Sequence, residues 1–228
     1  MSIVKKLLSL ALVGAMLTGL SSCSGKPVNE SSDTSATDTT VLAGELETTG
    51  NETSETSATE SKSPFGKAVV VYFSCSGNTK SVASKIALAA RCKSYEIVPS
   101  KPYTTEDLNY NSKKSRATKE QNDASARPEI EGSISDWSSY DTVFLGYPIW
   151  FAKAPRILCT FVESYDFQGK TVIPFCTSGS SGVGASATEL ASLAKNGGKW
   201  IDGTRFSSSV KEKDISEWLN TLTESGTI

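Results

Sequence analysis

Apolar and polar positions follow two different periods through residues 67–228. Short runs of β-branched and aromatic residues are typical of buried strands, and apolar positions that recur every three or four residues are typical of helices. The short runs predict strands over 68–73, 94–98, 141–147, 170–176 and 200–206. The helical repeats predict helices over 79–91, within 105–123, and over 154–164, 186–195 and 214–222.

This alternation of strands and helices predicts an α/β fold. Short, strongly apolar strands that are separated by helices favour a doubly wound parallel sheet with helices on both faces. Because crossovers between parallel strands are right-handed, ligand-binding loops gather at the carboxyl ends of the strands. The loops after 68–73, 141–147 and 170–176 are therefore the first places to look for a functional site.

The beginning of the chain has a different pattern. Lys5 and Lys6 precede an apolar run over 7–20, which is followed by small residues directly before Cys23. A basic start, a short apolar run and small residues are typical of a secretory signal. The cysteine resembles that of a bacterial lipobox, so we expect a lipoprotein signal peptide over 1–23 in which Cys23 is acylated. An ordinary signal peptide with an incidental cysteine is the alternative.

Residues 24–66 consist mostly of Ser, Thr, Glu, Asp and Gly. Such a segment buries too little apolar surface to offset the entropy of ordering it, so we expect a disordered tether. With Cys23 acylated, the tether would hold the domain over 67–228 at the extracytoplasmic face of the cell membrane through the lipid anchor alone. Acidic residues outnumber lysines in the tether, whereas the domain is nearly neutral, which gives no case for a nucleic-acid partner.

Histidine is absent from the chain. Its absence excludes Ser-His-Asp and Cys-His catalysis and histidine-ligated metal sites, and we predict neither catalytic side chains nor a metal. The cysteines of the domain have no Cys-x-x-Cys spacing, so free thiols are expected at Cys75, Cys92, Cys159 and Cys176. Cys75 lies near a predicted helix N-terminus, where a thiolate is favoured. The arginine that cysteine phosphatases carry shortly after their nucleophile is missing, however.

The loop after the first predicted strand has the sequence Ser-Cys-Ser-Gly-Asn-Thr over 74–79. Hydroxyl groups and backbone N–H groups that converge at a helix N-terminus are typical of an anion site. The loop contains no lysine, and it has neither the Gly-x-x-x-x-Gly-Lys-Ser/Thr spacing nor the Gly-x-Gly-x-x-Gly spacing. It therefore favours a terminal phosphate monoester that is held by hydrogen bonds rather than by a cation.

The loops after the third and fourth predicted strands are also unusual. Residues 146–151 read Gly-Tyr-Pro-Ile-Trp-Phe, in which Trp150 could lie flat on a planar conjugated ring or, with Tyr147, plug the edge of the sheet. Residues 176–184 are mostly glycine and small hydroxyl residues, which could bind the polar edge of a planar ring through backbone N–H groups or serve only as a flexible connection. Three such loops at strand ends carry more weight than any one of them alone.

In combination, these motifs resemble the flavodoxin-like superfamily, particularly a bacterial short-chain group with Tyr-Phe-Ser-x-Ser-Gly-Asn-Thr, Gly-Tyr-Pro-Ile-Trp and Pro-Phe-Cys-Thr-Ser-Gly. The resemblance covers 67–228 in order and implies a five-stranded parallel sheet, ordered 2-1-3-4-5, that binds FMN non-covalently. It also implies the residues that would hold each part of FMN. These are Ser74, Ser76, Gly77, Asn78 and Thr79 for the phosphate, Pro148, Ile149 and Trp150 for one flavin face, and Thr177, Ser178 and Gly179 for the other side and edge.

Two features depart from carrier flavodoxins. Many of those proteins stack a second aromatic residue on the outer flavin face from the loop after the fourth strand, and none occurs between Thr177 and Ala187. Carrier flavodoxins are also usually strongly acidic, whereas this domain is nearly neutral. Both features argue against a dedicated soluble electron carrier, and they leave the expectation of FMN binding unchanged.

The resemblance implies an FMN-dependent redox protein, in which the flavin supplies the electron chemistry and the protein supplies binding and orientation. Its electron donor and acceptor could be NAD(P)H, a quinone or a redox protein. An electron carrier and an NAD(P)H-dependent reductase both remain open. A different class is a non-redox surface module that uses the same crevice for another phosphorylated ligand. Under the redox interpretation the purified domain should be yellow.

Overall fold

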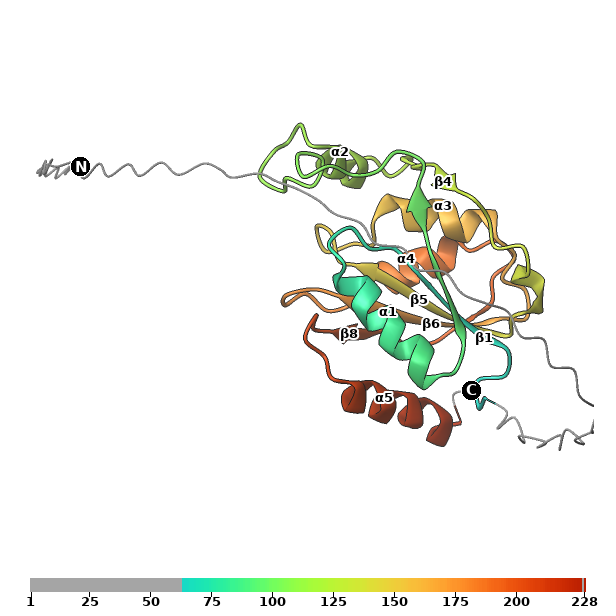
Figure 1. Cartoon of the computed structure of the whole chain (residues 1–228). Coiled ribbons are helices and arrows are strands. Elements are labelled where there is room, and N and C mark those ends of the chain that lie inside the picture. Colours follow the sequence, from blue (N-terminus) through green and yellow to red (C-terminus); the bar gives the residue numbers. More distant parts are fainter. Residues whose placement is uncertain (1–62, 227) are drawn as a thin grey trace, which may run out of the picture. The chain divides into compact units, whose positions relative to one another are not determined.

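The structure is a computed structural model that describes residues 63–226 and 228, and a parallel β-sheet forms the centre of the described part (Figure 1). The strands lie in the order β2-β1-β5-β6-β7, and β8 also pairs with β6. Their bounds are β1 (Ala68–Tyr72), β2 (Lys93–Glu96), β5 (Thr142–Pro148), β6 (Thr171–Thr177), β7 (Lys199–Trp200) and β8 (Thr204–Phe206). The predicted doubly wound parallel sheet is confirmed, with sequential strands ordered 2-1-3-4-5.

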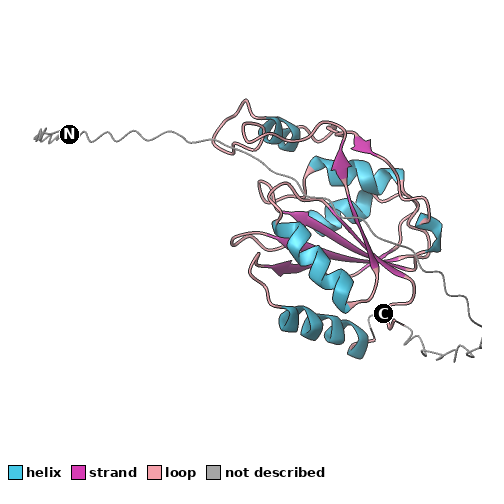
Figure 2. Ribbon diagram, viewed as in Figure 1, coloured by secondary structure: helices cyan, strands magenta, loops and turns pink. Residues whose placement is uncertain are grey.

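Helices cover both faces of this sheet (Figure 2). The core beneath α1 and α5 is separate from the core beneath α3 and α4. The helices are α1 (Asn78–Ala89), α2 (Arg116–Asn122), α3 (Arg156–Ser164), α4 (Ser186–Leu193) and α5 (Glu212–Glu224). None of the helices in the described part of the chain is long and apolar enough to cross a bilayer.

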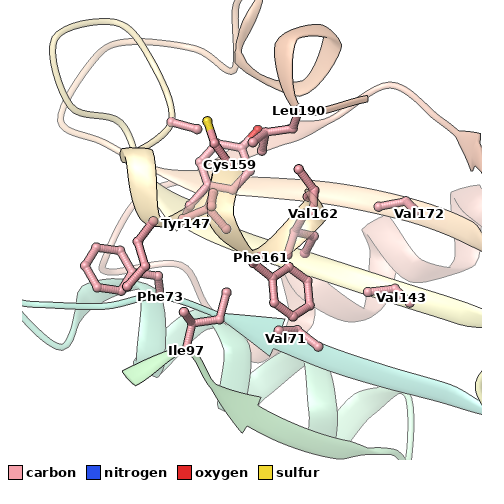
Figure 3. Packing of buried hydrophobic residues seen from close by; sticks show 14 of the residues in the cluster. Val71, Phe73, Ile97, Val143, Tyr147, Cys159, Phe161, Val162, Val172 and Leu190 are labelled. Atoms are coloured by element: carbon pink, nitrogen blue, oxygen red, sulfur yellow. The ribbon is translucent and has the colours of Figure 1, made fainter. Parts of the chain in front are cut away.

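Strand β1 shows why the sheet needs a cover on each side. Every residue of β1 is buried. Val70 and Tyr72 join the core beneath α1 and α5, whereas Val69 and Val71 join the other core, where Val71 lies near Phe161 of α3 (Figure 3). Because successive side chains of a strand point to opposite faces, a strand with both faces covered is apolar at every position. This is the pattern that the sequence has over 68–73.

The last strand differs from the prediction over 200–206, because the edge of the sheet is divided into β7 and β8. β7 pairs with Thr171 and Val172, and β8 pairs with residues 175–177 of the same strand. Pro174 lies between these two pairings and has no N–H group to donate. The connecting residues 201–203 also bulge against a shorter stretch of β6, so continuous pairing is interrupted.

The polar segment between β2 and β5 is less helical than predicted. Only α2 forms within the predicted range 105–123, and the N-terminus of α2 is capped by the Ser115 hydroxyl. Before α2, the side chains of Thr104 and Asp107 each accept a hydrogen bond from the other's backbone N–H. Such local bonds compete with helix formation. The segment also contains a two-stranded antiparallel sheet and a short 3₁₀ helix that the sequence did not predict: β3 (Val98–Pro99), β4 (Ile130–Glu131) and η1 (Trp137–Ser139).

The chain joins the domain a few residues before the predicted boundary at 67. Phe65 is 4% exposed, and its ring packs against Phe144 of β5 at a centroid distance of 5.3 Å. The Ser63 hydroxyl donates to the carbonyl oxygen of Ala90 at the end of α1. The signal peptide predicted over 1–23, the lipidation of Cys23 and nearly all of the predicted tether lie outside the described residues.

Candidate functional site

Loops from the carboxyl ends of β1, β5, β6 and β8 line one cavity of about 310 Å³. This is the edge of a doubly wound sheet at which ligands bind. The cavity brings together residues from all three predicted loops: Ser76, Asn78, Pro148, Ile149, Trp150, Thr177, Ser178 and Gly179. Three lining residues were not predicted: Tyr110, Ser207 and Ser208.

The three remaining predicted residues, Ser74, Gly77 and Thr79, lie in the loop over 74–79 without lining the cavity. Gly77 is the N-cap of α1 and has a φ of 82°, a left-handed conformation that favours glycine. No side chain caps the first turn of α1, and that turn contains no acidic residue. The first N–H groups of this helix are therefore available to an anion.

The hydroxyl of Ser74 is the second sign of a ligand at this loop. Its Oγ atom is buried and has no hydrogen-bond partner among the described residues. A buried polar group without a partner is unfavourable and uncommon in native structures. A phosphate oxygen would satisfy this hydroxyl, so the loop fits the terminal phosphate of a mononucleotide.

Lys80 is the cation closest in sequence to this loop, and it is already engaged. Its Nζ atom lies 2.8 Å from Oε2 of Glu96, which also accepts a hydrogen bond from the hydroxyl of Tyr72. The loop therefore offers hydroxyl and N–H donors, while the charge of Lys80 is paired with Glu96.

A hydrogen bond joins the first and third loops below the cavity. The Oγ1 atoms of Thr79 and Thr177 are 2.8 Å apart, and both residues are buried. Thr79 thus fixes the start of α1 against the end of β6. In this structure the Thr79 hydroxyl is hydrogen-bonded to another side chain of the protein, whereas the Ser74 hydroxyl has no hydrogen-bond partner among the described residues.

The loop after β5 turns its tryptophan inward. Trp150 is 4% exposed, and its ring lies edge-on to Phe73 and Tyr103 at centroid distances of 5.6 and 5.3 Å. The Nε2 atom of Gln121 donates to the carbonyl oxygens of Trp150 and Ala154 at 2.9 and 3.2 Å. Trp150 therefore belongs to the core as well as to the wall of the cavity.

The loop after β6 is held by a residue from β8. Nη1 of Arg205 lies 3.1 Å from the carbonyl oxygen of Ser178 and 3.5 Å from that of Gly179. The Ser178 hydroxyl donates to the carbonyl oxygen of Ser181 within the same loop. Because these bonds engage carbonyl oxygens, the loop can offer a ligand its N–H groups.

Cys75 stays a neutral thiol. Cys75 is exposed, but partial desolvation by its neighbours raises the pKa of its thiol to about 12 and outweighs the opposing influence of Arg116. The thiol is thus protonated at neutral pH, contrary to the thiolate that its place near a helix N-terminus favours. A cysteine-based reaction at this loop has no support from its electrostatics.

This sheet, with loops from its strand ends around one cavity, defines a doubly wound α/β protein of the flavodoxin type. The flavodoxin family model matches residues 67–222, and the chain belongs to that family. A proposed flavoprotein from Bacteroides eggerthii is 43% identical, with a TM-score of 0.63 over 68% of this chain and 96% of its own. A proposed flavoprotein from Bacteroides uniformis is 39% identical, with the same TM-score over 68% and 98%. No curated protein matches the chain.

A third solved structure is a flavoprotein from Lactobacillus acidophilus in complex with FMN. It is 22% identical, with a TM-score of 0.52 over 67% of this chain and 98% of its own. At this identity the likeness shows a shared fold. The sequence-based resemblance to the flavodoxin-like superfamily is therefore confirmed by the family match and the fold together.

Proposed function

We propose that this protein binds FMN in the cavity and acts as a redox protein. The observation that carries the proposal is the buried, unpartnered hydroxyl of Ser74 beside the uncapped start of α1. Membership of the flavodoxin family supports the same ligand. When bound, FMN supplies electron or hydride transfer, and the protein supplies binding, orientation and electrostatics.

Each loop is assigned to a different part of FMN. The hydroxyl and N–H groups of the loop over 74–79, from Ser74, Ser76, Gly77, Asn78 and Thr79, hold the phosphate. Pro148 and Ile149 line the ring on one side with Trp150 behind them, and Thr177, Ser178 and Gly179 line its other side and edge. Lys80 contributes little to phosphate binding, because its charge is paired with Glu96.

Cofactor binding is tested with the purified, reconstituted protein. We expect a yellow protein that retains one FMN per chain after gel filtration, with the visible absorbance of a bound flavin. A colourless protein that binds a different phosphate monoester instead would favour the non-redox surface module. A protein that binds no phosphate monoester would exclude both functions.

The role as carrier or reductase is tested next, on the same preparation. Steady oxidation of NADH or NADPH in the presence of a quinone identifies a reductase. Rapid single-electron exchange with a redox protein, without turnover of NAD(P)H, identifies a carrier. The nearly neutral charge of the domain favours the reductase, because it lacks the strongly acidic surface of carrier flavodoxins.

We further propose that Cys23 is acylated and tethers the domain at the extracytoplasmic face of the cell membrane. The basic and apolar residues before Cys23 support this location. Wild-type protein should fractionate with the membrane, whereas Cys23→Ser should remain unprocessed or be shed into the medium. Soluble wild-type protein whose N-terminus is Ser24 or a later residue would overturn the anchor.

A further inference from the structure

A second hollow lies on the α3 side of the sheet and is separate from the proposed flavin cavity. Its volume is about 180 Å³, and it adjoins an outer groove of about 510 Å³ that shares part of its lining. Val71, Ile97 and Phe161 form its floor and are buried together in the core (Figure 3). No residue of the hollow or the groove lines the flavin cavity. Together the two spaces have the size of a small-molecule site, roughly 300–1,000 Å³.

The connection between β2 and β5 explains why this hollow exists. A crossover in a doubly wound sheet normally lays a helix on the strands. The single α-helix of this connection, α2, has seven residues, and its Gln121 side chain is bonded to the carbonyl oxygens of Trp150 and Ala154 near the flavin cavity. On this side, β1 and β2 are therefore bordered by α3 and by the ribbon of β3 and β4, with a space between them.

Three aromatic side chains line the hollow: Tyr95 from β2, Phe161 from α3, and Tyr165 directly after α3. Hydrogen bonds hold two of these rings. The Tyr95 hydroxyl donates to Asp136 at 3.1 Å, and the Tyr165 hydroxyl accepts from the N–H of Ile134 at 2.8 Å. Two walls of the hollow are thus fixed by bonds within the protein, before any ligand binds.

The unpaired charges beside these rings are negative. Glu131 lines the hollow and Glu129 lines the groove, and neither forms an ion pair with a described residue. Glu96 also lines the hollow, but its carboxylate is paired with Lys80. Within the described part of the chain, no lysine or arginine lines either space. Aromatic rings beside unpaired carboxylates attract an organic cation.

We propose that this hollow binds a small methylated ammonium ion, which packs against Tyr95, Phe161 and Tyr165 while Glu131 balances its charge. The attraction between a cation and a ring is strongest where water is excluded, and the apolar floor supplies that condition. A methylated ammonium donates no N–H hydrogen bonds, which suits a hollow whose two phenol hydroxyls are already engaged. The site does not depend on the proposed binding of FMN.

Choline and 3,3-dimethylbutan-1-ol test the proposal, because the two molecules are nearly identical in shape and only choline carries a charge. We expect the full-length protein to bind choline about 5- to 30-fold more tightly than the alcohol, as a desolvated contact between cation and rings implies. Isothermal titration calorimetry measures both dissociation constants. Phosphocholine represents a lipid headgroup and should bind more weakly than choline, because Glu129 and Glu131 repel its phosphate. Tighter binding of phosphocholine would overturn a free ammonium ion as the ligand.

Four substitutions assign the contacts. Glu131→Gln should weaken choline about 2- to 5-fold and leave the alcohol unchanged, whereas Glu212→Gln, at an exposed position in α5, should change neither. Tyr95→Leu should weaken choline about 3- to 10-fold because it removes a ring. Ser133→Trp, at an exposed position that lines both spaces, should block both ligands. Thermal unfolding of each variant shows whether the fold is kept.

A competition experiment separates this site from the flavin cavity. Because the two spaces share no residue, saturating FMN should leave the affinity for choline unchanged. Choline binding that FMN abolishes would overturn the second site while flavin binding stands. If wild-type protein does not bind choline, or binds choline and the alcohol equally well, the ammonium site is overturned and the proposed function is unaffected.

Discussion

The loop over 74–79 meets the cavity with hydroxyl and N–H groups, whereas Tyr110 lines it with an aromatic ring that packs against Phe151. The first region is tied to the sheet through the buried bond between Thr79 and Thr177. The second combines a strained turn with a segment that is held largely by local bonds. One region thus suits a phosphate and the other a planar ring. The difference implies that substitutions can separate the two halves of one ligand.

The largest effect is expected behind the aromatic region, at Trp150. Because its ring is buried against Phe73 and Tyr103, Trp150→Ala should reduce the free energy of unfolding by about 3–5 kcal/mol. Urea unfolding of the protein without FMN measures this change. A variant that unfolds like wild type but loses flavin affinity would instead make Trp150 a ligand contact.

Ser74→Ala tests the phosphate region. Loss of one hydrogen bond to a charged group should weaken FMN by about 10- to 100-fold and leave riboflavin unchanged. The protein without FMN should be as stable as wild type or slightly more stable, because the variant removes a buried hydroxyl that has no partner. Ser81→Ala, at an exposed position in α1, is the matched control. Equal losses for FMN and riboflavin would show that the loop has been misassigned.

Arg205 lies outside both regions and positions the loop after β6. Arg205→Met removes its bonds to the carbonyl oxygens of Ser178 and Gly179, so both FMN and riboflavin should bind about 2- to 10-fold more weakly. Parallel titrations of the two flavins measure the loss. Lys213→Met, which breaks an exposed pair with Glu217, should have no effect. A loss confined to FMN would assign Arg205 to the phosphate instead.

The smallest effect concerns pH. Although both side chains are exposed, partial desolvation by the residues around them raises the pKa of the Cys75 thiol and of the Tyr110 phenol to about 12. Neither group loses its proton between pH 6 and 9, and riboflavin affinity should therefore change less than about twofold over that interval. Fluorescence titrations at several pH values measure this. A loss of affinity as pH rises through 9 that Cys75→Ser abolishes would show an ionising thiol.

The polar region could be predicted from the sequence, because Ser, Gly and Asn directly after a buried strand identify a strand-end loop. The same rule could have found Ser207 and Ser208, which follow β8 at the same edge. Tyr110 could not be found in this way. It belongs to a segment with little regular structure, whose path to the cavity depends on tertiary contacts such as that between Tyr110 and Phe151.

The orientation of neighbouring aromatic residues was also beyond prediction. Trp150 and Phe151 are adjacent and similar in character, and either could have faced the core. The choice follows from the tight turn between Trp150 and Lys153 and from the donor that Gln121 supplies from α2. Neither a turn with positive φ at Phe-Ala nor a contact across the fold has a signature in local sequence.

The packing of Phe65 against Phe144 of β5 fixes the edge of the sheet at which the chain enters the domain. In a parallel sheet all strands begin at one edge and end at the other, so residue 63 joins the edge opposite to the cavity. Any attachment through the N-terminus therefore pulls on the side of the domain that lies away from the proposed flavin. The chain therefore enters the domain without occupying the edge of the sheet at which the cavity opens.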